Sequence, residues 1–221
     1  MLTSNQIHSF SLQFITNSES DEELLDSIRK VLDGGCRWVQ LRMKNSDTER
    51  VTSLAWKVKE ICKSYSSIFI IDDYVQICHE VDADGVHLGK NDMSPKEARK
   101  LLGNKKIIGG TCNTFADIIS VHSFVDYIGC GPFRFTTTKK NLAPTLGLDG
   151  YREIVWRSRS AGINIPIVAI GGITINDIPD ILDCGPNGIA LSGEILGAAD
   201  IAHKTRQIVN VIDNALGRFG I

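Results

Sequence analysis

The sequence predicts an α/β protein folded as a single (β/α)8 TIM-barrel domain, with a polar leader over residues 1–11 and the barrel over residues 12–221. Eight short apolar runs of strand length alternate with segments of helical periodicity. The runs are apolar throughout, as in parallel strands buried on both faces. Glycines typical of a phosphate site follow the last two runs. An open doubly wound sheet is the alternative, but short, uniform strands, eight in number, favour the barrel.

The first β-α-β unit can be recognised in the sequence. The first predicted strand is LQFI, residues 12–15. Apolar residues between positions 21 and 33 recur at helical spacing, and Ser20, three residues before Glu23, predicts a capping box. WVQLR, residues 38–42, is the second strand and completes a β-α-β unit.

The same alternation continues through the rest of the sequence. Further strands are predicted at 68–71, 86–88, 106–109, 126–129, 166–170 and 188–191. Further helices are predicted at 48–64, 74–80, from 94 onward, and at 115–122, 149–161, 175–184 and 200–216. This inventory of eight strands and roughly eight helices is that of a (β/α)8 barrel.

Composition and charge indicate an ordinary globular protein with small-molecule partners. Hydrophobic residues make up 43% of the chain, and the net charge is −2 with Lys and Arg scattered, so we expect neither nucleic-acid nor membrane binding. The apolar runs are well short of the roughly 20 residues that a spanning helix needs. No signal peptide is visible, so we expect a cytoplasmic protein, with a homo-oligomer left open. Six cysteines at irregular spacings favour reduced, buried thiols over disulfides or a zinc site.

Polar side chains extend from the second predicted strand. Gln40, Arg42 and Lys44 alternate with apolar residues, so all three share one face. In a barrel that face is the interior near the C-terminal mouth, where two cations call for an anion because buried unpaired charge is costly. Arginine suits bidentate binding of phosphate, and lysine acts as a point charge. The alternative is a strand edge with solvated charges.

Carboxylates follow the third and fourth predicted strands. Asp72 and Asp73 close the run IFIIDD, and Asp92 follows GVHLG. Carboxylates on adjacent strand ends can bind Mg²⁺, which keeps several waters and takes other ligands from substrate phosphates. With the cations of the second strand they predict a magnesium diphosphate site, and helix capping is the alternative. His87, on the fourth strand, is either a packed histidine or a substrate contact.

A long polar segment follows the sixth predicted strand, between residues 133 and 148. A loop of this length in a compact domain is usually a lid or a binding element, and a surface excursion is the alternative. Its hydroxyls and cation come from Thr136, Thr138 and Lys139.

Glycine turns end the last two strands. Gly171 and Gly172 follow the seventh strand, and Ser192 and Gly193 follow the eighth. Backbone amides at these two turns of a barrel commonly hold a single phosphate. The sequence therefore predicts a monophosphate site here.

The motifs VQLRMK, IIDD, DGVHLGKND, YIGCGPFRFTTTK and IPIVAIGGI, in this order and spacing, resemble those of the thiamine-phosphate synthase family. The resemblance runs from about residue 12 to residue 201. It implies a transferase that joins hydroxymethylpyrimidine diphosphate to a thiazole phosphate, giving thiamine phosphate and diphosphate. We expect a magnesium-assisted dissociative substitution without a side-chain nucleophile, in which electrostatic stabilisation of the leaving diphosphate does most of the catalytic work.

The resemblance also implies roles for individual residues. Those expected on the diphosphate are Arg42, Lys44 and Lys139, which we take as catalytic, with Thr111 nearby. Those expected on magnesium are Asp73 and Asp92. Gln40 is expected to contact the pyrimidine. The thiazole phosphate is expected to contact Thr136 and Thr138, together with backbone amides around Gly172, Ser192 and Gly193. Asp72 and His87 are also expected to contact substrate.

Three positions depart from the family pattern. Asp72 stands where the family usually has asparagine, which adds a negative charge beside a diphosphate. Asn113 stands where many relatives have histidine, and Gly193 stands opposite a family serine. Two alternatives share the barrel: a thiazole tautomerase, for which that histidine is expected, and a non-catalytic barrel that binds thiamine phosphate.

Overall fold

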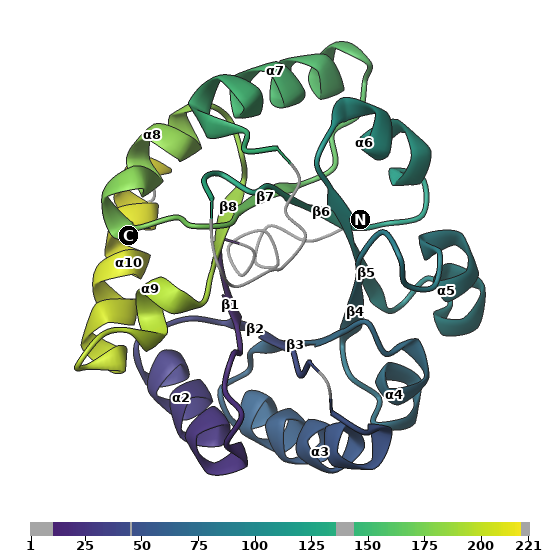
Figure 1. Cartoon of the computed structure of the whole chain (residues 1–221), viewed down its shortest axis with the longest axis vertical. Coiled ribbons are helices and arrows are strands. Elements are labelled where there is room, and N and C mark those ends of the chain that lie inside the picture. Colours follow the sequence, from purple (N-terminus) through teal and green to yellow (C-terminus); the bar gives the residue numbers. More distant parts are fainter. Residues whose placement is uncertain (1–10, 45, 136–143, 218–221) are drawn as a thin grey trace.

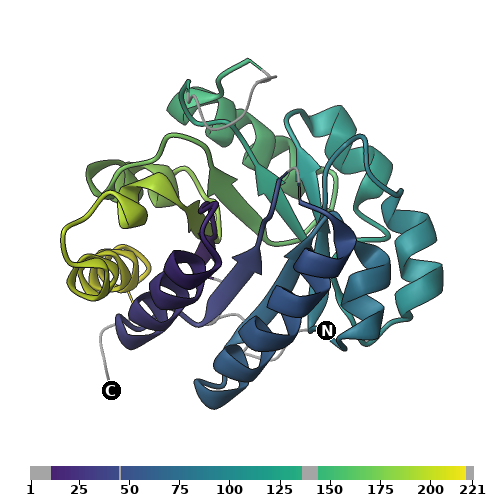
Figure 2. The ribbon, with the colours of Figure 1, turned by 60° about the horizontal axis from the view of Figure 1, so that its bottom comes forward.

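The computed structural model describes residues 11–44, 46–135 and 144–217. Eight parallel strands pair in chain order, and β1 closes the sheet by pairing with β8. Figure 1 looks into the ring of strands and shows the helices around its outside, and Figure 2 shows the same shell tilted. The predicted (β/α)8 barrel is confirmed, and the leader over residues 1–11 stays a prediction because residues 1–10 lie outside the described ranges.

The strands are short and almost entirely buried. They are β1 (Leu12–Ile15), β2 (Trp38–Leu41), β3 (Ile68–Asp72), β4 (Gly85–Leu88), β5 (Ile107–Cys112), β6 (Tyr127–Cys130), β7 (Ile167–Ile170) and β8 (Gly188–Leu191). The helices are α2 (Asp21–Asp33), α3 (Thr48–Ser64), α4 (Val75–Glu80), α5 (Pro95–Leu102), α6 (Phe115–Val121), α7 (Gly147–Ser160), the 3₁₀ turn η1 (Ile175–Asp177), α8 (Ile178–Asp183), α9 (Gly193–Leu196) and α10 (Ile201–Ala215).

Local sequence explains where the helices begin. Ser94 and Glu97 form a complete capping box, with Pro95 in the first turn of α5. The box predicted for α2 is only half formed. The Ser20 side chain accepts from the Glu23 N–H, but the Glu23 carboxylate accepts from Ser18 instead. The Ser20 N–H donates to Ser18 Oγ at 3.2 Å, so Ser18 takes the place of the Glu23 carboxylate in the box.

Two elements differ from expectation near the last strands. The predicted helix 175–184 is split into η1 and α8, because Pro179 in the first turn of α8 lacks an N–H to continue the ladder. The short helix α9 (Gly193–Leu196) follows the strand predicted at 188–191 and was not predicted, because four residues are too few to show a helical period.

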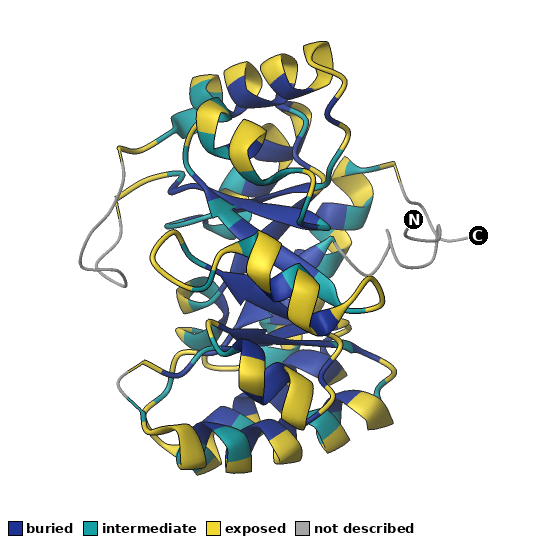
Figure 3. Ribbon diagram, turned by 90° about the vertical axis from the view of Figure 1, so that its right-hand side faces the viewer, coloured by how far each residue is buried: buried dark blue, intermediate teal, exposed yellow. Residues whose placement is uncertain are grey.

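The core has two layers, which Figure 3 shows as buried strands inside half-buried helices. Outward-facing strand residues pack against the helices in one large cluster. Inward-facing residues form a second cluster within the barrel, which includes Trp38 and Tyr127, whose rings meet edge to face at 4.7 Å. A Cβ on Gly109 would lie 2.2 Å from the Tyr127 ring, so this glycine makes room for the tyrosine. The interior below the site is thus filled and rigid.

The six cysteines are buried and free, as predicted. Burial raises the pKa of Cys36 to about 11 and that of Cys62 to about 12, so these thiols stay protonated at neutral pH. Within the described ranges, no helix has the length and apolar character needed to cross a membrane.

Candidate active site

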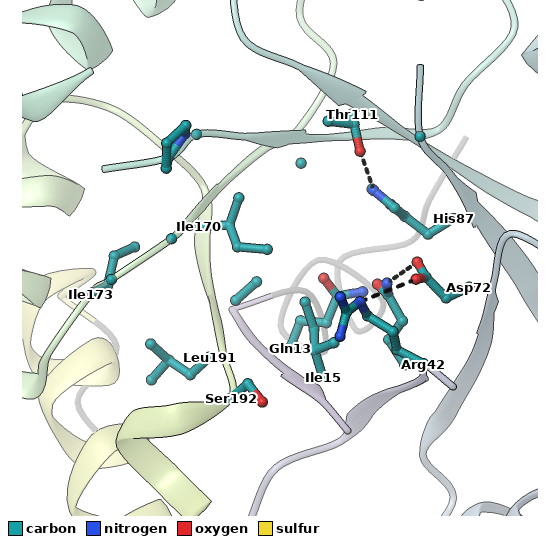
Figure 4. Close-up of a pocket in the computed structure, with 18 of the residues that line it drawn as sticks. Gln13, Ile15, Arg42, Asp72, His87, Thr111, Ile170, Ile173, Leu191 and Ser192 are labelled. Carbon is teal, nitrogen blue, oxygen red and sulfur yellow. Dashed lines mark hydrogen bonds and ion pairs between the residues drawn. The ribbon is translucent and has the colours of Figure 1, made fainter. Parts of the chain in front are cut away.

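A pocket of about 450 Å³ lies at the C-terminal end of the barrel and takes residues from all eight strands or the turns that follow them (Figure 4). Every predicted site residue that the structure describes lines this pocket: Gln40, Arg42, Lys44, Asp72, Asp73, His87, Asp92, Thr111, Gly172, Ser192 and Gly193. Thr136, Thr138 and Lys139 lie outside the described residues. The predicted convergence of strand ends is therefore present in the fold.

The end of β2 carries a cation, and a carboxylate from β3 faces it. Arg42 Nε lies 3.6 Å from Asp72 Oδ2, and both side chains are largely buried. Thr16, beyond β1, fixes the Arg42 backbone, because its Oγ1 accepts from the Arg42 N–H at 2.9 Å and donates to the Arg42 carbonyl at 3.1 Å. The first strand therefore positions the arginine on the second.

Asp72 also orients the buried amide of Gln40. Gln40 Nε2 donates to Asp72 Oδ1 at 2.5 Å. The other amide atom, Gln40 Oε1, is buried and has no hydrogen-bond partner among the described residues. An unsatisfied buried acceptor is costly, and this one belongs to a residue that lines the pocket. A ligand with an N–H donor would satisfy it.

Asp73 and Asp92 form a carboxylate pair at the ends of β3 and β4. Burial raises the pKa of Asp73 to about 7, aided by the charge of Asp72 and by a hydrogen bond with Asp92. Asp73 adopts φ 68°, a left-handed conformation that aspartate tolerates better than most residues. Asp92 Oδ2 accepts from the Gly89 N–H at 2.7 Å, which holds the loop after β4.

This pair fits a divalent cation that prefers oxygen ligands. A bound cation would stabilise the charged form of Asp73, whose pKa is raised by burial and by the neighbouring carboxylates. No cluster of three or more His, Cys, Asp or Glu suited to a metal occurs in the described part of the chain. Two carboxylates still suit Mg²⁺, since it commonly keeps waters and binds substrate phosphates at its other positions.

A hydrogen-bonded chain crosses the barrel and includes three residues that line the pocket, Gln13, His87 and Thr111. Gln13 Nε2 donates to the Tyr127 hydroxyl at 3.2 Å, which lies 3.0 Å from His87 Nδ1. His87 Nε2 in turn lies 3.0 Å from Thr111 Oγ1 (Figure 4). Burial raises the pKa of Tyr127, so its hydroxyl stays protonated. Both ring nitrogens of His87 thus have hydrogen-bond partners, and Nε2 supports Thr111, while contact of His87 with substrate stays a prediction.

Sequence reasoning missed Gln13 and Tyr127. The available signal for Gln13 is a polar residue in the otherwise apolar strand LQFI, at a position that alternates to the barrel interior. Tyr127 gives no such signal, because a tyrosine at the start of a strand is typical of ordinary core packing.

The opposite side of the pocket is formed by the turns after β7 and β8. Gly171 and Gly172 have φ of 98° and 69°, and a Cβ on Gly172 would lie 2.5 Å from Arg134 Cγ. Ser192 Oγ is buried and has no partner in the described structure. A Cβ on Gly193 would meet nothing within 4 Å, so the missing family serine leaves open space.

The position of the expected tautomerase histidine has a structural role here. Asn113 Nδ2 donates to the Gly131 carbonyl, which joins the end of β5 to the turn after β6. A neutral amide held in this way cannot exchange protons as a histidine does.

Comparison with known proteins decides the family. A sequence profile described as thiamine monophosphate synthase matches residues 12–195. The chain belongs to this family. The family resemblance predicted from the motifs is therefore confirmed, and with it the assignment of the chain as a transferase enzyme.

Similar proteins from other organisms are named thiamine-phosphate synthase. Thiamine-phosphate synthase from Phocaeicola vulgatus is 53% identical over 201 residues, which cover 90% of this chain and 97% of that protein. Thiamine-phosphate synthase from Bacteroides fragilis is 52% identical over 202 residues, covering 91% and 99%. A solved structure titled thiamine phosphate pyrophosphorylase from Pyrococcus furiosus superposes with a TM-score of 0.83 at 30% identity, covering 96% of this chain and 99% of that one. These relatives support thiamine-phosphate synthase function in a chain that acts on small molecules.

Proposed function

We propose that this enzyme joins hydroxymethylpyrimidine diphosphate to the phosphate ester of a hydroxyethylthiazole, releasing diphosphate and thiamine phosphate. One observation carries the proposal. A single pocket has Arg42 and the Asp73–Asp92 pair on one side and the glycine turns of β7 and β8 on the other. Two anionic substrates of different charge can thus meet with their uncharged reacting atoms between them.

The diphosphate would bind at the ends of β2, β3 and β4. Arg42 and Lys44 would contact its oxygens, and Thr111, supported by His87, would donate its hydroxyl. Asp73 and Asp92 would hold Mg²⁺, which when bound supplies electrostatic stabilisation of the leaving diphosphate. Lys139 would add a cation, a role that rests on the family resemblance alone.

The pyrimidine would lie against Gln40. Its exocyclic amine would donate to Gln40 Oε1, the buried acceptor that has no partner among the described residues. Asp72, which accepts from Gln40 Nε2, would hold the amide in the orientation that reads an amine. This contact gives the Asp72 carboxylate a function that does not require it to touch the diphosphate.

The thiazole phosphate would bind across the pocket. Backbone N–H groups near Gly172 and Gly193 and the unpartnered hydroxyl of Ser192 would donate to its oxygens. Thr136 and Thr138 would join them, by family resemblance. The phosphate would thereby aim the thiazole nitrogen at the pyrimidine.

The chemistry would be a dissociative substitution. The bond between the pyrimidine methylene carbon and the diphosphate oxygen breaks, and its electron pair leaves with the diphosphate. The thiazole nitrogen lone pair then forms the new bond to the methylene carbon. No side-chain nucleophile is needed, which agrees with cysteine thiols that burial keeps protonated. The fixed charges of the pocket would stabilise the pyrimidine methylene cation, and exclusion of water by the pocket walls would protect it from hydrolysis.

Two other functions fit the pocket less well. A thiazole tautomerase would not need the cations and carboxylates at the ends of β2 to β4. In place of its expected histidine this chain has Asn113, whose amide donates to the Gly131 carbonyl. A non-catalytic thiamine phosphate binder would not need two carboxylates, Asp73 and Asp92, beside the cations of the pocket. The cytoplasmic location and the oligomeric state stay predictions.

Diphosphate release, measured with both substrates and Mg²⁺, tests the proposal. We expect release only when both substrates and the metal are present, in a one-to-one ratio with thiamine phosphate. Release without the thiazole would indicate simple hydrolysis, and no release in the complete mixture would refute the proposal.

A further inference from the structure

Arg134 links the segment after β6 to the glycine turn after β7. Its guanidinium forms a bidentate pair with Asp177, with Nη1 at 2.7 Å from Oδ2 and Nη2 at 2.7 Å from Oδ1. Nη1 also donates to the Gly172 carbonyl at 3.0 Å, and the Arg134 backbone N–H donates to the Gly171 carbonyl at 3.1 Å. One residue therefore holds two successive carbonyls of the turn.

The contacts of Arg134 with the two carbonyls also fix the direction of the neighbouring N–H groups. In a trans peptide the N–H points away from the C=O of the same unit. With the Gly171 and Gly172 carbonyls held by Arg134, the N–H groups of Gly172 and Ile173 are directed away from it. Both residues line the pocket, and neither N–H donates to another described group. Arg134 thus leaves these two donors available to a ligand.

Asp177 connects Arg134 to the start of the 3₁₀ turn η1. Its Oδ2 accepts from the Thr174 N–H at 2.8 Å and from the Thr174 hydroxyl at 2.7 Å, at the start of η1. A single carboxylate thereby ties Arg134 to Thr174, the residue just before η1. Bidentate arginine pairs are geometrically specific, so the turn has little freedom while the pair is intact.

The pair also balances charge beside an anion site. Two carboxylates, Asp177 and Glu194, lie near the turn, and each has a cationic partner: Arg134 for the first and Lys204, at 2.9 Å, for the second. Without Arg134, the Asp177 carboxylate would stand uncompensated near the incoming phosphate. Geometry and electrostatics therefore act in the same direction.

We propose that Arg134 and Asp177 are a positioning pair that directs the Gly172 and Ile173 N–H groups toward the substrate monophosphate and so sets its affinity. The assignment rests on the proposed function, in that the monophosphate is that of the thiazole. Neither residue needs to touch the reacting atoms.

Arg134→Gln and Arg134→Lys test the pair, because they leave the Asp177–Thr174 cap in place. We expect Arg134→Gln to raise KM for the thiazole phosphate by about tenfold, the effect of a charged hydrogen bond lost. KM for the pyrimidine diphosphate should not change. Arg134→Lys should give a KM for the thiazole phosphate between those of the wild type and Arg134→Gln, since lysine keeps the charge but cannot form the bidentate pair. The matched control is Arg152→Gln, which removes a surface pair with Asp149 and should change neither KM.

Binding of inorganic phosphate, measured by calorimetry with thermal melting alongside, separates this inference from the proposed function. Weaker phosphate binding by Arg134→Gln at an unchanged Tm supports the positioning role even if the wild-type protein fails to make thiamine phosphate. An unchanged phosphate affinity and thiazole KM would overturn it. So would equal increases in both substrate KM values together with a lower Tm, since those indicate general loosening. A wild-type protein that bound no phosphate and made no product would overturn both proposals.

Discussion

The Gln40 amide donates to Asp72 Oδ1 at 2.5 Å, so the β3 carboxylate decides which atom of the β2 amide stays unpartnered beside the pocket. Asp72 is also the residue that departs from the family asparagine, and its charge lies 3.6 Å from Arg42 Nε. The carboxylate therefore has two opposed effects. It orients Gln40 toward an amine, and it competes with the diphosphate for Arg42.

Substitution at Asp72 separates these effects. In Asp72→Asn the amide oxygen can still accept from Gln40 while the charge is lost, so we expect KM for the pyrimidine diphosphate to fall several-fold with kcat little changed. In Asp72→Ala the charge is lost as well and nothing holds the Gln40 amide, so the same KM should be about tenfold higher than in Asp72→Asn, as for one lost hydrogen bond to a charged group. Steady-state kinetics checks both, and an Asp72→Ala enzyme with the KM of Asp72→Asn would contradict the proposed orientation of Gln40.

Tyr127→Phe tests the hydrogen-bonded chain that crosses the barrel. It keeps the ring against Trp38 and removes the hydroxyl between Gln13 and His87. Because it leaves buried polar groups without a partner, we expect a loss of about 1–3 kcal/mol in the free energy of unfolding. We also expect a lower kcat, since Thr111 loses its support.

Nitrogen-15 NMR of His87 reports which ring nitrogen carries the proton, and a packing defect alone would not change that tautomer. Gln13 donates to the Tyr127 oxygen, so the protonated hydroxyl is left to donate to His87 Nδ1. We therefore expect the wild-type ring to carry its proton on Nε2, facing Thr111, and a mixture of tautomers in Tyr127→Phe. A wild-type ring protonated on Nδ1 would show that the chain runs the other way.

Asp73 gives the metal-free protein a pH-dependent stability. Its pKa is raised from 3.8 to about 7, first by burial and then by Asp72, so the folded state binds this proton more tightly than the unfolded state. Stability from this group is fully present below pH 3.8 and is lost as pH rises through 7. We expect Asp73→Asn to raise Tm at pH 8 and to leave it almost unchanged at pH 4.

Magnesium should reverse the order of the two proteins. At pH 8 the metal is expected to raise the Tm of the wild-type protein and to have little effect on Asp73→Asn. Asp26→Asn, which removes a surface pair with Lys30, is the control and should respond to magnesium as the wild type does. Equal magnesium responses in all three proteins would argue against a metal at Asp73.

Asp92→Asn tests the second carboxylate without removing its loop contact, because the amide oxygen can still accept from the Gly89 N–H. We expect Tm to stay near that of the wild type and kcat/KM to fall roughly 100-fold or more, the scale of a lost electrostatic contact to a leaving group. Raising the magnesium concentration should restore part of the activity. A turnover rate close to wild type would remove Asp92 from the metal site.

The barrel and one face of its pocket could be predicted from the sequence for a physical reason. Parallel strands buried on both faces must be apolar, so polar residues such as Arg42 and Asp73 stand out where strands end. All strands of a barrel end at the same mouth, so these residues had to converge. The chemistry proposed for them rests on residue type and on the family resemblance.

The rest depends on register and on contacts between residues far apart in the chain. Tyr127 meets Gln13 across 114 positions, and it does so because Gly109 leaves space for its ring. The pair of Arg134 and Asp177 arises from two loops whose approach no local pattern encodes. The helix α9 was missed because four residues are too few to display a helical period.

A crystal structure with thiamine phosphate, diphosphate and Mg²⁺ would show whether the two anions bind on opposite sides of the pocket. We expect diphosphate against Arg42 and Lys44, the metal between Asp73 and Asp92, the pyrimidine amine on Gln40 Oε1, and the monophosphate at the turns of Gly172 and Gly193. Both anions on one side of the pocket, or a metal away from the two carboxylates, would refute the proposed arrangement.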